Sequence, residues 1–131
     1  IAICAASHEF KNIPHTLHDL LNERLLVREQ GSGTRHILEE SLKVRGLSIS
    51  DFIHYTQIEN MHTIISLTKK DCGISFIYKI AVKEELQKGV LKEIVLNDFK
   101  LQHNFEFIWE KDSLFTEKYI SISEEFLHNT F

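Results

Sequence analysis

The sequence predicts an α/β domain in which a mostly parallel sheet is flanked by helices. Short apolar, β-branched or aromatic runs alternate with segments of helical periodicity along the chain, as in proteins built from strand–helix–strand units. Glycines follow several of the helical segments, where a left-handed cap ends a helix. The 131 residues include a single proline and no low-complexity tract, so nothing marks a linker between separate domains.

The elements follow from local signals, taken in chain order. Residues 1–6 are an apolar run that predicts a buried strand. Thr16, with Asp19 three positions later, is typical of a helix start, and this short helix reaches about residue 22. The run "RLLVR" at 24–28 predicts a second strand.

A longer helix follows a glycine-rich loop. Ile37, Leu38, Ser41 and Leu42 recur at helical spacing. Gly46 then stands where a left-handed C-terminal cap would end the helix. The loop between the second strand and this helix is therefore a strand-to-helix junction.

The same alternation continues in the middle of the chain. The run "IHYTQI" at 53–58 is rich in β-branched and aromatic residues and predicts a strand. Asn60 is placed to cap a helix that reaches about Lys70. Gly73 follows that helix, and "ISFIY" at 74–78 predicts the next strand.

The last part of the chain adds two strands and two helices. A helix over 81–88 is closed by Gly89, and "VLKEIVL" at 90–96 predicts a strand. The run "FEFIWE" at 105–110 predicts another strand, and an amphipathic helix follows from residue 113 to about residue 128.

Composition and charge exclude several classes of protein. The formal net charge of −4 gives no broad basic surface, so direct nucleic-acid binding by this chain is not expected. No segment approaches the roughly 20 apolar residues of a membrane-spanning helix, and no membrane role is expected.

Cys4 and Cys72 fit neither a CxxC motif nor a disulfide framework, which suits the cytoplasm. The chain opens on an apolar run without an initiator Met or a basic segment, so we expect a fragment of a longer protein rather than a signal peptide.

The stretch "REQGSGTR" at 28–35 is the main candidate for a binding site. A strand, a Gly-Ser-Gly-Thr loop and a helix in this order direct backbone N–H groups and the positive end of the helix dipole toward a ligand, which favours an anion. The hydroxyls of Ser32 and Thr34 add donors, and Gly33 lets a ligand approach the backbone. An ordinary N-terminal cap by Ser32 or Thr34 is an equal alternative. A P-loop is excluded because the Gly-Lys-Ser/Thr ending of that motif is missing.

Other polar residues offer little chemistry. His15 and His18 are close in sequence, but no Cys or carboxylate completes a ligand set, so no metal is expected. Ser32 lies in Gly-Ser-Gly rather than in the GxSxG of a nucleophile elbow, and the sequence offers no base for it. We therefore expect no catalytic residues and no cofactor. Asn60 and Tyr78 stand at two other strand–helix junctions, where a doubly wound sheet brings loops together. Asn60 is most simply a helix cap.

Three blocks of sequence together resemble a known family. The blocks "RLLVREQGSGTR", "ENMHTIISLTKKDCGISFI" and "AVKEELQKGVLKEIVL" resemble, in order and spacing, the effector-binding domain of LysR-type bacterial transcriptional regulators. The tail "FEFIWEK" and the helix after it also fit. The resemblance covers residues 1–128 and implies a lobe of the type 2 periplasmic-binding-protein-like fold.

The resemblance also implies how much of the family's architecture is present. The N-terminal winged helix-turn-helix and the first half of the effector domain have no counterpart in this sequence. Residues 1–131 are then a partial effector-binding domain. About 7–104 would be the second lobe, 1–6 and 105–111 the crossing strands, and 112–131 the closing helix of the first lobe.

The function implied by the resemblance is effector sensing. Ser32, Gly33 and Thr34 would form one wall of a pocket between two lobes, with Asn60 and Tyr78 nearby. A small anionic metabolite or inorganic anion bound there would alter the geometry of bound DNA. The full protein would be a cytoplasmic homodimer or homotetramer, not an enzyme, that holds DNA through an N-terminal domain absent from this chain. A transporter's solute-binding protein with the same two-lobed fold is the alternative.

The sequence departs from the family pattern at three positions. Gln30 and Tyr78 stand where proline is frequent, and Asp71 stands where the first glycine of a Gly-x-Gly turn is usual. We expect Asp71 and Tyr78 to line the cleft and to mark a different effector. Arg28 or Arg35 would add positive charge to the site if its side chain turned inward.

Overall fold

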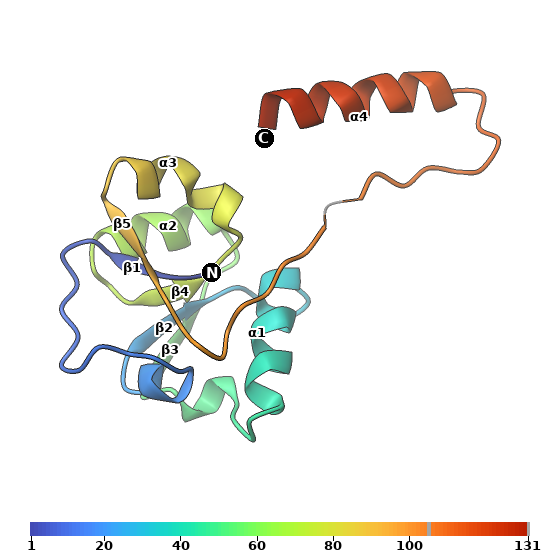
Figure 1. Cartoon of the computed structure of the whole chain (residues 1–131). Coiled ribbons are helices and arrows are strands. Elements are labelled where there is room, and N and C mark those ends of the chain that lie inside the picture. Colours follow the sequence, from blue (N-terminus) through green and yellow to red (C-terminus); the bar gives the residue numbers. More distant parts are fainter. Residues whose placement is uncertain (105, 131) are drawn as a thin grey trace. The chain divides into compact units, whose positions relative to one another are not determined.

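The chain divides into two compact units. The computed structural model describes residues 1–104 and 106–130, and its units are Ile1–Leu101 and Gln102–Phe131 (Figure 1). The first unit contains the sheet and all the short connections between its strands. The second contains one long helix and the segment that precedes it.

The first unit is built on one mixed sheet. Its strands are β1 (Ala2–Ala5), β2 (Arg24–Val27), β3 (His54–Gln57), β4 (Ile74–Phe76) and β5 (Leu91–Ile94). They lie in the order β3-β2-β4-β1-β5. β2 is parallel to β3 and β4, whereas β1 is antiparallel to both of its neighbours, β4 and β5.

The predicted α/β fold is confirmed, with one correction to the sheet. All strands but β1 run in one direction, so the expectation of a mostly parallel sheet holds for the strands that are joined by helices. β1 is joined to β2 by a connection with only a short 3-10 turn, and it fills the space between β4 and β5 in the opposite direction. Strands that alternate with helices are parallel because each helix carries the chain back across the sheet, and no such helix connects β1 to β2.

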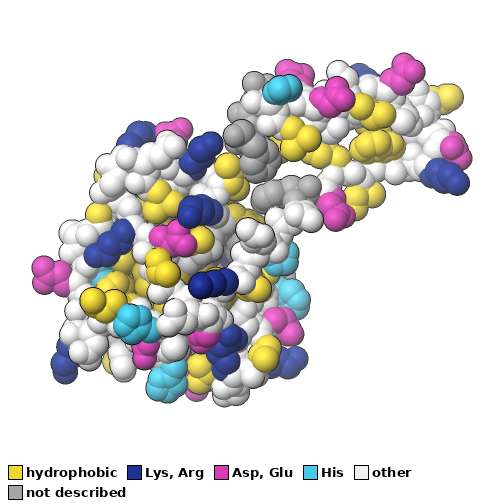
Figure 2. All heavy atoms as spheres, viewed as in Figure 1, with side chains coloured by type: hydrophobic (Ala, Val, Ile, Leu, Met, Phe, Trp, Pro, Cys, Tyr) yellow, Lys and Arg dark blue, Asp and Glu magenta, His cyan; other side chains and the backbone are white. Residues whose placement is uncertain are grey.

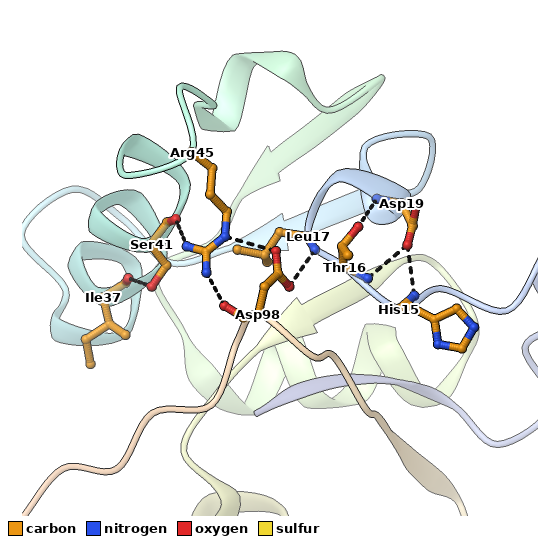
Figure 3. Close-up of polar contacts among 8 residues, drawn as sticks. All are labelled: His15, Thr16, Leu17, Asp19, Ile37, Ser41, Arg45 and Asp98. Atoms are coloured by element: carbon orange, nitrogen blue, oxygen red, sulfur yellow. Dashed lines mark hydrogen bonds and ion pairs between the residues drawn. The ribbon is translucent and has the colours of Figure 1, made fainter.

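Helices cover both faces of the sheet. The α-helices of the first unit are α1 (Gly33–Lys43), α2 (Met61–Lys69) and α3 (Lys83–Gln87). The 3-10 turns are η1 (His18–Leu20), η2 (Ile49–Asp51) and η3 (Lys79–Val82). The helix expected from Thr16 is only the turn η1, because the Asp19 carboxylate binds the N–H groups of His15 and Thr16, both at 2.9 Å, and closes a local turn (Figure 3).

The core lies in two layers, one on each side of the sheet. On one side, Leu38 and Leu42 of α1 pack with Leu25 of β2 in a cluster of buried residues. On the other, Ile65 of α2 packs with Ile3 of β1 in a second cluster. α1 and α2 therefore lie on opposite faces of the sheet (Figure 1). Burying a leucine side chain contributes about 1.5–3 kcal/mol, so these contacts hold both helices against the sheet.

A tight turn before β4 explains one of the glycines. A Cβ atom on Gly73 would lie 2.5 Å from the carbonyl oxygen of Arg24, and the residue has φ of +155°. No other residue fits there, because the neighbouring backbone of β2 occupies the space. Asp71 has φ of 59°, a left-handed conformation that explains why glycine is usual at this position.

A polar cluster fixes the chain where it leaves β5. The Asp98 carboxylate accepts hydrogen bonds from Arg45 Nε at 2.9 Å and from the Leu17 N–H at 3.0 Å (Figure 3). The Arg45 guanidinium also donates to the carbonyl oxygens of Asp98 and Ser41. Segments that are far apart in sequence, the residues after β5, the C-terminal end of α1 and the start of η1, are thereby joined.

The second unit corrects one strand prediction. Residues 106–110 have no regular secondary structure, and Phe105 lies outside the described residues. A strand needs a hydrogen-bonded neighbour, and the described part of this unit holds no other strand. Helix α4 (Thr116–Thr130) forms as expected but starts later than residue 113.

Apolar side chains are exposed on the second unit. Ile108 and Leu114 are exposed to 86% and 98%. Phe107 and Phe126 make an edge-to-face contact with ring centroids 5.4 Å apart. On the face shown in Figure 2, hydrophobic side chains gather along one side of this unit, and charges of both signs lie on both units. Among the described residues, no helix is long and apolar enough to cross a membrane.

Candidate functional site

The loops after three parallel strands meet at one edge of the sheet. β2 lies between β3 and β4 and is parallel to both. The carboxyl ends of these three strands therefore lie side by side, at the end of the sheet that we call its carboxyl edge. The glycine loop follows β2, Asn60 follows β3, and Tyr78 follows β4. The predicted site residues are therefore brought to the same edge, with the glycine loop in the middle.

The glycine loop opens directly into α1. Ser32 has extended backbone, with φ of −69° and ψ of 134°, and stands at the N-cap position. Its N–H donates to the Glu29 carbonyl at 3.2 Å, and its carbonyl accepts from the His36 N–H at 2.9 Å. Gly31 has φ of +87°, which lets the chain turn from the strand into the helix.

The hydroxyls of this loop do not cap the helix. In the described structure, the Ser32 side chain makes no cap hydrogen bond with α1. Its Oγ lies 3.1 Å from Thr34 Oγ1 instead. The ordinary cap is therefore not formed, and the first backbone N–H groups of α1 are left without the side-chain acceptor that a cap supplies. Gly33 is exposed, and Thr34 is buried at 8% exposure.

Asn60 has the other role that the sequence allowed. Its side-chain oxygen accepts a hydrogen bond from the Thr63 N–H at 3.1 Å, so it caps α2. The residue is exposed at the shared edge. Its amide group keeps donor capacity beyond the cap, because the cap uses only the oxygen.

Tyr78 lies beside the glycine loop. A Cβ atom placed on Gly33 would be 3.5 Å from the Tyr78 hydroxyl oxygen. The hydroxyl therefore lies in van der Waals range of the loop, and the half-buried ring stands at the start of η3. The sequence analysis placed Tyr78 near the glycine loop because a doubly wound sheet brings such strand–helix junctions together, and the two do lie side by side.

The two arginines of the glycine loop bind partners within the chain. Arg28 makes a bidentate pair with Glu29, at 2.8 and 2.9 Å, and these hydrogen bonds lower the pKa of the Glu29 carboxyl below its ordinary value. Arg35 is buried at 8% exposure, and its Nε donates to Glu39 Oε1 at 2.7 Å. Its Nη1 donates to the Arg28 carbonyl at 3.1 Å and to Gln57 Oε1 at 2.7 Å. The spacing of Arg35 and Glu39 is readable in the sequence, but the contact with Gln57 is not, because it joins a helix to a strand 22 positions away.

The expectation that Asp71 lines the cleft is wrong. β4 is parallel to β2, so a residue before β4 lies at the amino edge, opposite the glycine loop. There Asp71 Oδ1 lies 2.6 Å from His8 Nδ1, and His8 Nε2 lies 3.4 Å from a Glu23 carboxylate oxygen. Asp71 closes a turn at the far end of the sheet and does not face the glycine loop.

Other chemistry-bearing groups do not extend the site. Burial raises the pKa of the Cys4 thiol to about 11, so the group is protonated and unreactive at neutral pH. His15 and His18 belong to the connection before β2, away from the glycine loop. Among the described residues, no group of three or more His, Cys, Asp or Glu side chains is arranged to hold a metal ion.

Comparison with known proteins gives the family. The model of the LysR substrate binding domain matches residues 1–119. An HTH-type transcriptional regulator of Methanocaldococcus jannaschii is 29% identical over 82 residues, which cover 63% of this chain and 28% of that protein. The chain thus spans less than a third of the regulator's length.

Solved structures share the fold. The regulatory domain of Synechocystis CcmR in complex with 2-PG has a TM-score of 0.69 at 16% identity, over 93% of this chain and 59% of that one. The effector binding domain of QuiR in complex with shikimate has a TM-score of 0.65 at 16% identity, over 99% and 61%. The predicted periplasmic-binding-protein-like fold is thus confirmed, and the matched family is one of transcriptional regulators rather than enzymes. Since the family model covers most of its residues, the chain belongs to the LysR substrate-binding domain family.

Proposed function

We propose that this chain is the effector-sensing part of a LysR-type transcriptional regulator and binds a small anionic metabolite or inorganic anion at the glycine-loop edge. The observation that carries the proposal is the N-terminus of α1, which has no side-chain cap and lies where the loops after β2, β3 and β4 meet. Structures of the same fold hold 2-PG and shikimate, which supports a small ligand for this domain.

The proposed contacts follow from the donors at this edge. The N–H groups of Gly33 and Thr34 and the hydroxyls of Ser32 and Thr34 are donors without a negative charge of their own. Tyr78 adds a hydroxyl beside Gly33, and Asn60 adds an exposed amide. A helix N-terminus stabilises an anion by about 0.3–1 kcal/mol when exposed and up to about 2 kcal/mol when partly buried. Charge-neutral donors of this kind favour a small, singly or doubly charged ligand.

The effector acts in this proposal by selecting one arrangement of two lobes. Residues 7–104 form the second lobe, residues 1–6 and 105–111 connect it to the first, and residues 112–131 close the first lobe. The opposite wall of the pocket then comes from residues outside this chain. An effector shifts the equilibrium only by its difference in affinity for the two arrangements, and each 1.4 kcal/mol is about tenfold.

The rest of the proposal concerns the whole protein. We assign it to the cytoplasm as a homodimer or homotetramer that binds DNA through an N-terminal domain. The coding sequence upstream of Ile1 tests this assignment. A winged helix-turn-helix followed by a first lobe is the expected result. An export signal followed directly by a first lobe would make the protein a transporter's solute-binding protein and remove DNA from the account.

Anion binding is tested on the chain itself by NMR titration. We expect shikimate, phosphate or bromide to shift the Gly33 and Thr34 amide resonances. Ser32→Ala and Thr34→Ala should weaken the response by about threefold or more, the loss of roughly one neutral hydrogen bond. Ser41→Ala is the matched control, since its hydroxyl binds the Ile37 carbonyl at 2.8 Å on the same helix. Equal responses in all three variants, or shifts spread over the surface, would refute the assignment.

A further inference from the structure

We propose that Arg35 is a positioning residue that sets the spacing between the two loops of the anion site, and that it is not a ligand of the effector. The inference rests on the proposed function for the identity of the site. Its own basis is the buried guanidinium beneath the loop. It replaces the simpler idea that a positive side chain of the glycine loop turns toward the anion.

The burial of Arg35 is the first step of the argument. The residue is only 8% exposed, and its guanidinium stays charged at any ordinary pH. A buried charge is costly unless hydrogen bonds and an opposite charge compensate it. Glu39 supplies the opposite charge one helical turn away, at 2.7 Å from Nε. A guanidinium held in this way is not available to turn toward an effector.

The positions of the other acceptors are the second step. Nη1 donates to the carbonyl of Arg28, the first residue after β2. The same atom donates to the side-chain oxygen of Gln57, the last residue of β3. One planar group therefore joins α1 to the ends of two neighbouring strands, from which the glycine loop and the Asn60 turn begin.

The two loops are coupled where these bonds are made. The Ile58 N–H donates to the Val27 carbonyl at 2.9 Å and continues the ladder between the two strands. The Arg35 bonds lie at the same end of this ladder, since Val27 is paired with Gln57. Loosening Arg35 therefore frees the start of both loops, and the distance between the Ser32–Thr34 wall and Asn60 is no longer fixed.

The chemistry explains why arginine is needed. Its planar fork serves several acceptors in fixed directions, whereas a lysine ammonium is a point charge on a flexible stem. Lysine at this position keeps the charge but not the geometry. The variant Arg35→Lys thus separates a role in positioning from a role as a source of charge.

Amide hydrogen exchange on the chain tests the positioning role without any ligand. The variants are Arg35→Lys and Gln57→Leu, which removes the acceptor and no charge. We expect exchange of both the Ser32 and Ile58 amides to accelerate about tenfold or more in each variant. Arg24→Lys, the same change on an exposed arginine at the other end of β2, should leave both rates unchanged. Unchanged rates at Ser32 and Ile58 in both variants would overturn the proposal.

Anion titration then separates positioning from direct contact. With shikimate as the probe, we expect Gln57→Leu and Arg35→Lys each to weaken binding about threefold or more, since the donors lose their spacing. Stronger binding by Gln57→Leu would mean that Gln57 holds back an arginine ligand, and the proposal would fail. If the wild-type chain binds no anion, the proposed function fails, while the exchange rates still decide whether Arg35 couples the loops.

Discussion

Replacing Gly33 with alanine should separate the stability of α1 from binding at its N-terminus. Gly33 is the first residue of the helix, and its φ does not lie in the positive range that favours glycine, so other residues fit its backbone. A Cβ atom there would meet the Tyr78 hydroxyl at 3.5 Å, an ordinary van der Waals contact. Alanine in a helix is favoured over glycine by about 0.5–1 kcal/mol. We therefore expect Gly33→Ala to fold and to be as stable as the wild type or slightly more stable.

Binding should change in the opposite direction. The added methyl group fills the space through which a ligand reaches the first amides of α1. If the whole contribution of the helix terminus is lost, about 0.3–2 kcal/mol, affinity falls roughly 2- to 30-fold. Urea denaturation followed by circular dichroism measures the first effect, and NMR titration with shikimate measures the second. Unchanged affinity in a folded Gly33→Ala variant would refute the idea that the ligand approaches over Gly33.

Two further predictions concern stability. Gly73→Ala should lower the free energy of unfolding of the first unit by about 3 kcal/mol or more. The new Cβ would meet the Arg24 carbonyl at 2.5 Å, and a positive φ adds backbone strain of its own. A loss below about 1 kcal/mol in urea denaturation would contradict this. Burial raises the pKa of Cys4 from 9.0 to about 11, so the folded chain keeps a proton that the unfolded chain releases. The stabilisation by Cys4 is complete below about pH 9 and is lost as the pH rises through 11. Thermal denaturation between pH 8 and 11 should show this decline in the wild type and a smaller one in Cys4→Ala.

Local signals in the sequence predicted the parts of the site that are themselves local. The strand before the glycine loop, the helix after it and the Asn60 cap each depend on residues within a few positions of one another. The structure has the cap as a hydrogen bond to the Thr63 N–H, three residues on. The sequence left open whether Ser32 caps α1, because the choice depends on a side-chain rotamer; here the hydroxyl lies against Thr34 instead.

Predictions that depended on distant partners failed or were incomplete. Asp71 was placed in the cleft from the position of the family's Gly-x-Gly turn; it precedes β4, and the parallel pairing of β4 with β2 puts its turn at the amino end of the sheet. Residues 105–110 have the composition of a strand, yet the described part of the second unit offers no strand to pair with. The contact between Arg35 and Gln57 joins two elements 22 positions apart, and neither residue carries a local sign of it.

The strand order explains why the glycine loop lies at the centre of the candidate site. From β2 the chain passes through α1 to β3 on one side, and then through α2 to β4 on the other side of β2. The order of strands thus reverses at β2, and α1 and α2 cover opposite faces of the sheet. Loops that leave in opposite directions open a crevice at the carboxyl end of the strand between them.

The carboxyl ends of β2 and β3 are joined to each other. The Ile58 N–H donates a backbone hydrogen bond to the Val27 carbonyl, and the Arg35 guanidinium binds the Arg28 carbonyl and the Gln57 side chain. A ligand at this edge of the sheet would therefore meet one wall that is fixed by the guanidinium, and a second wall at Tyr78, which follows β4. We expect the first wall to set affinity and the second, whose residue departs from the family pattern, to set which anion is preferred.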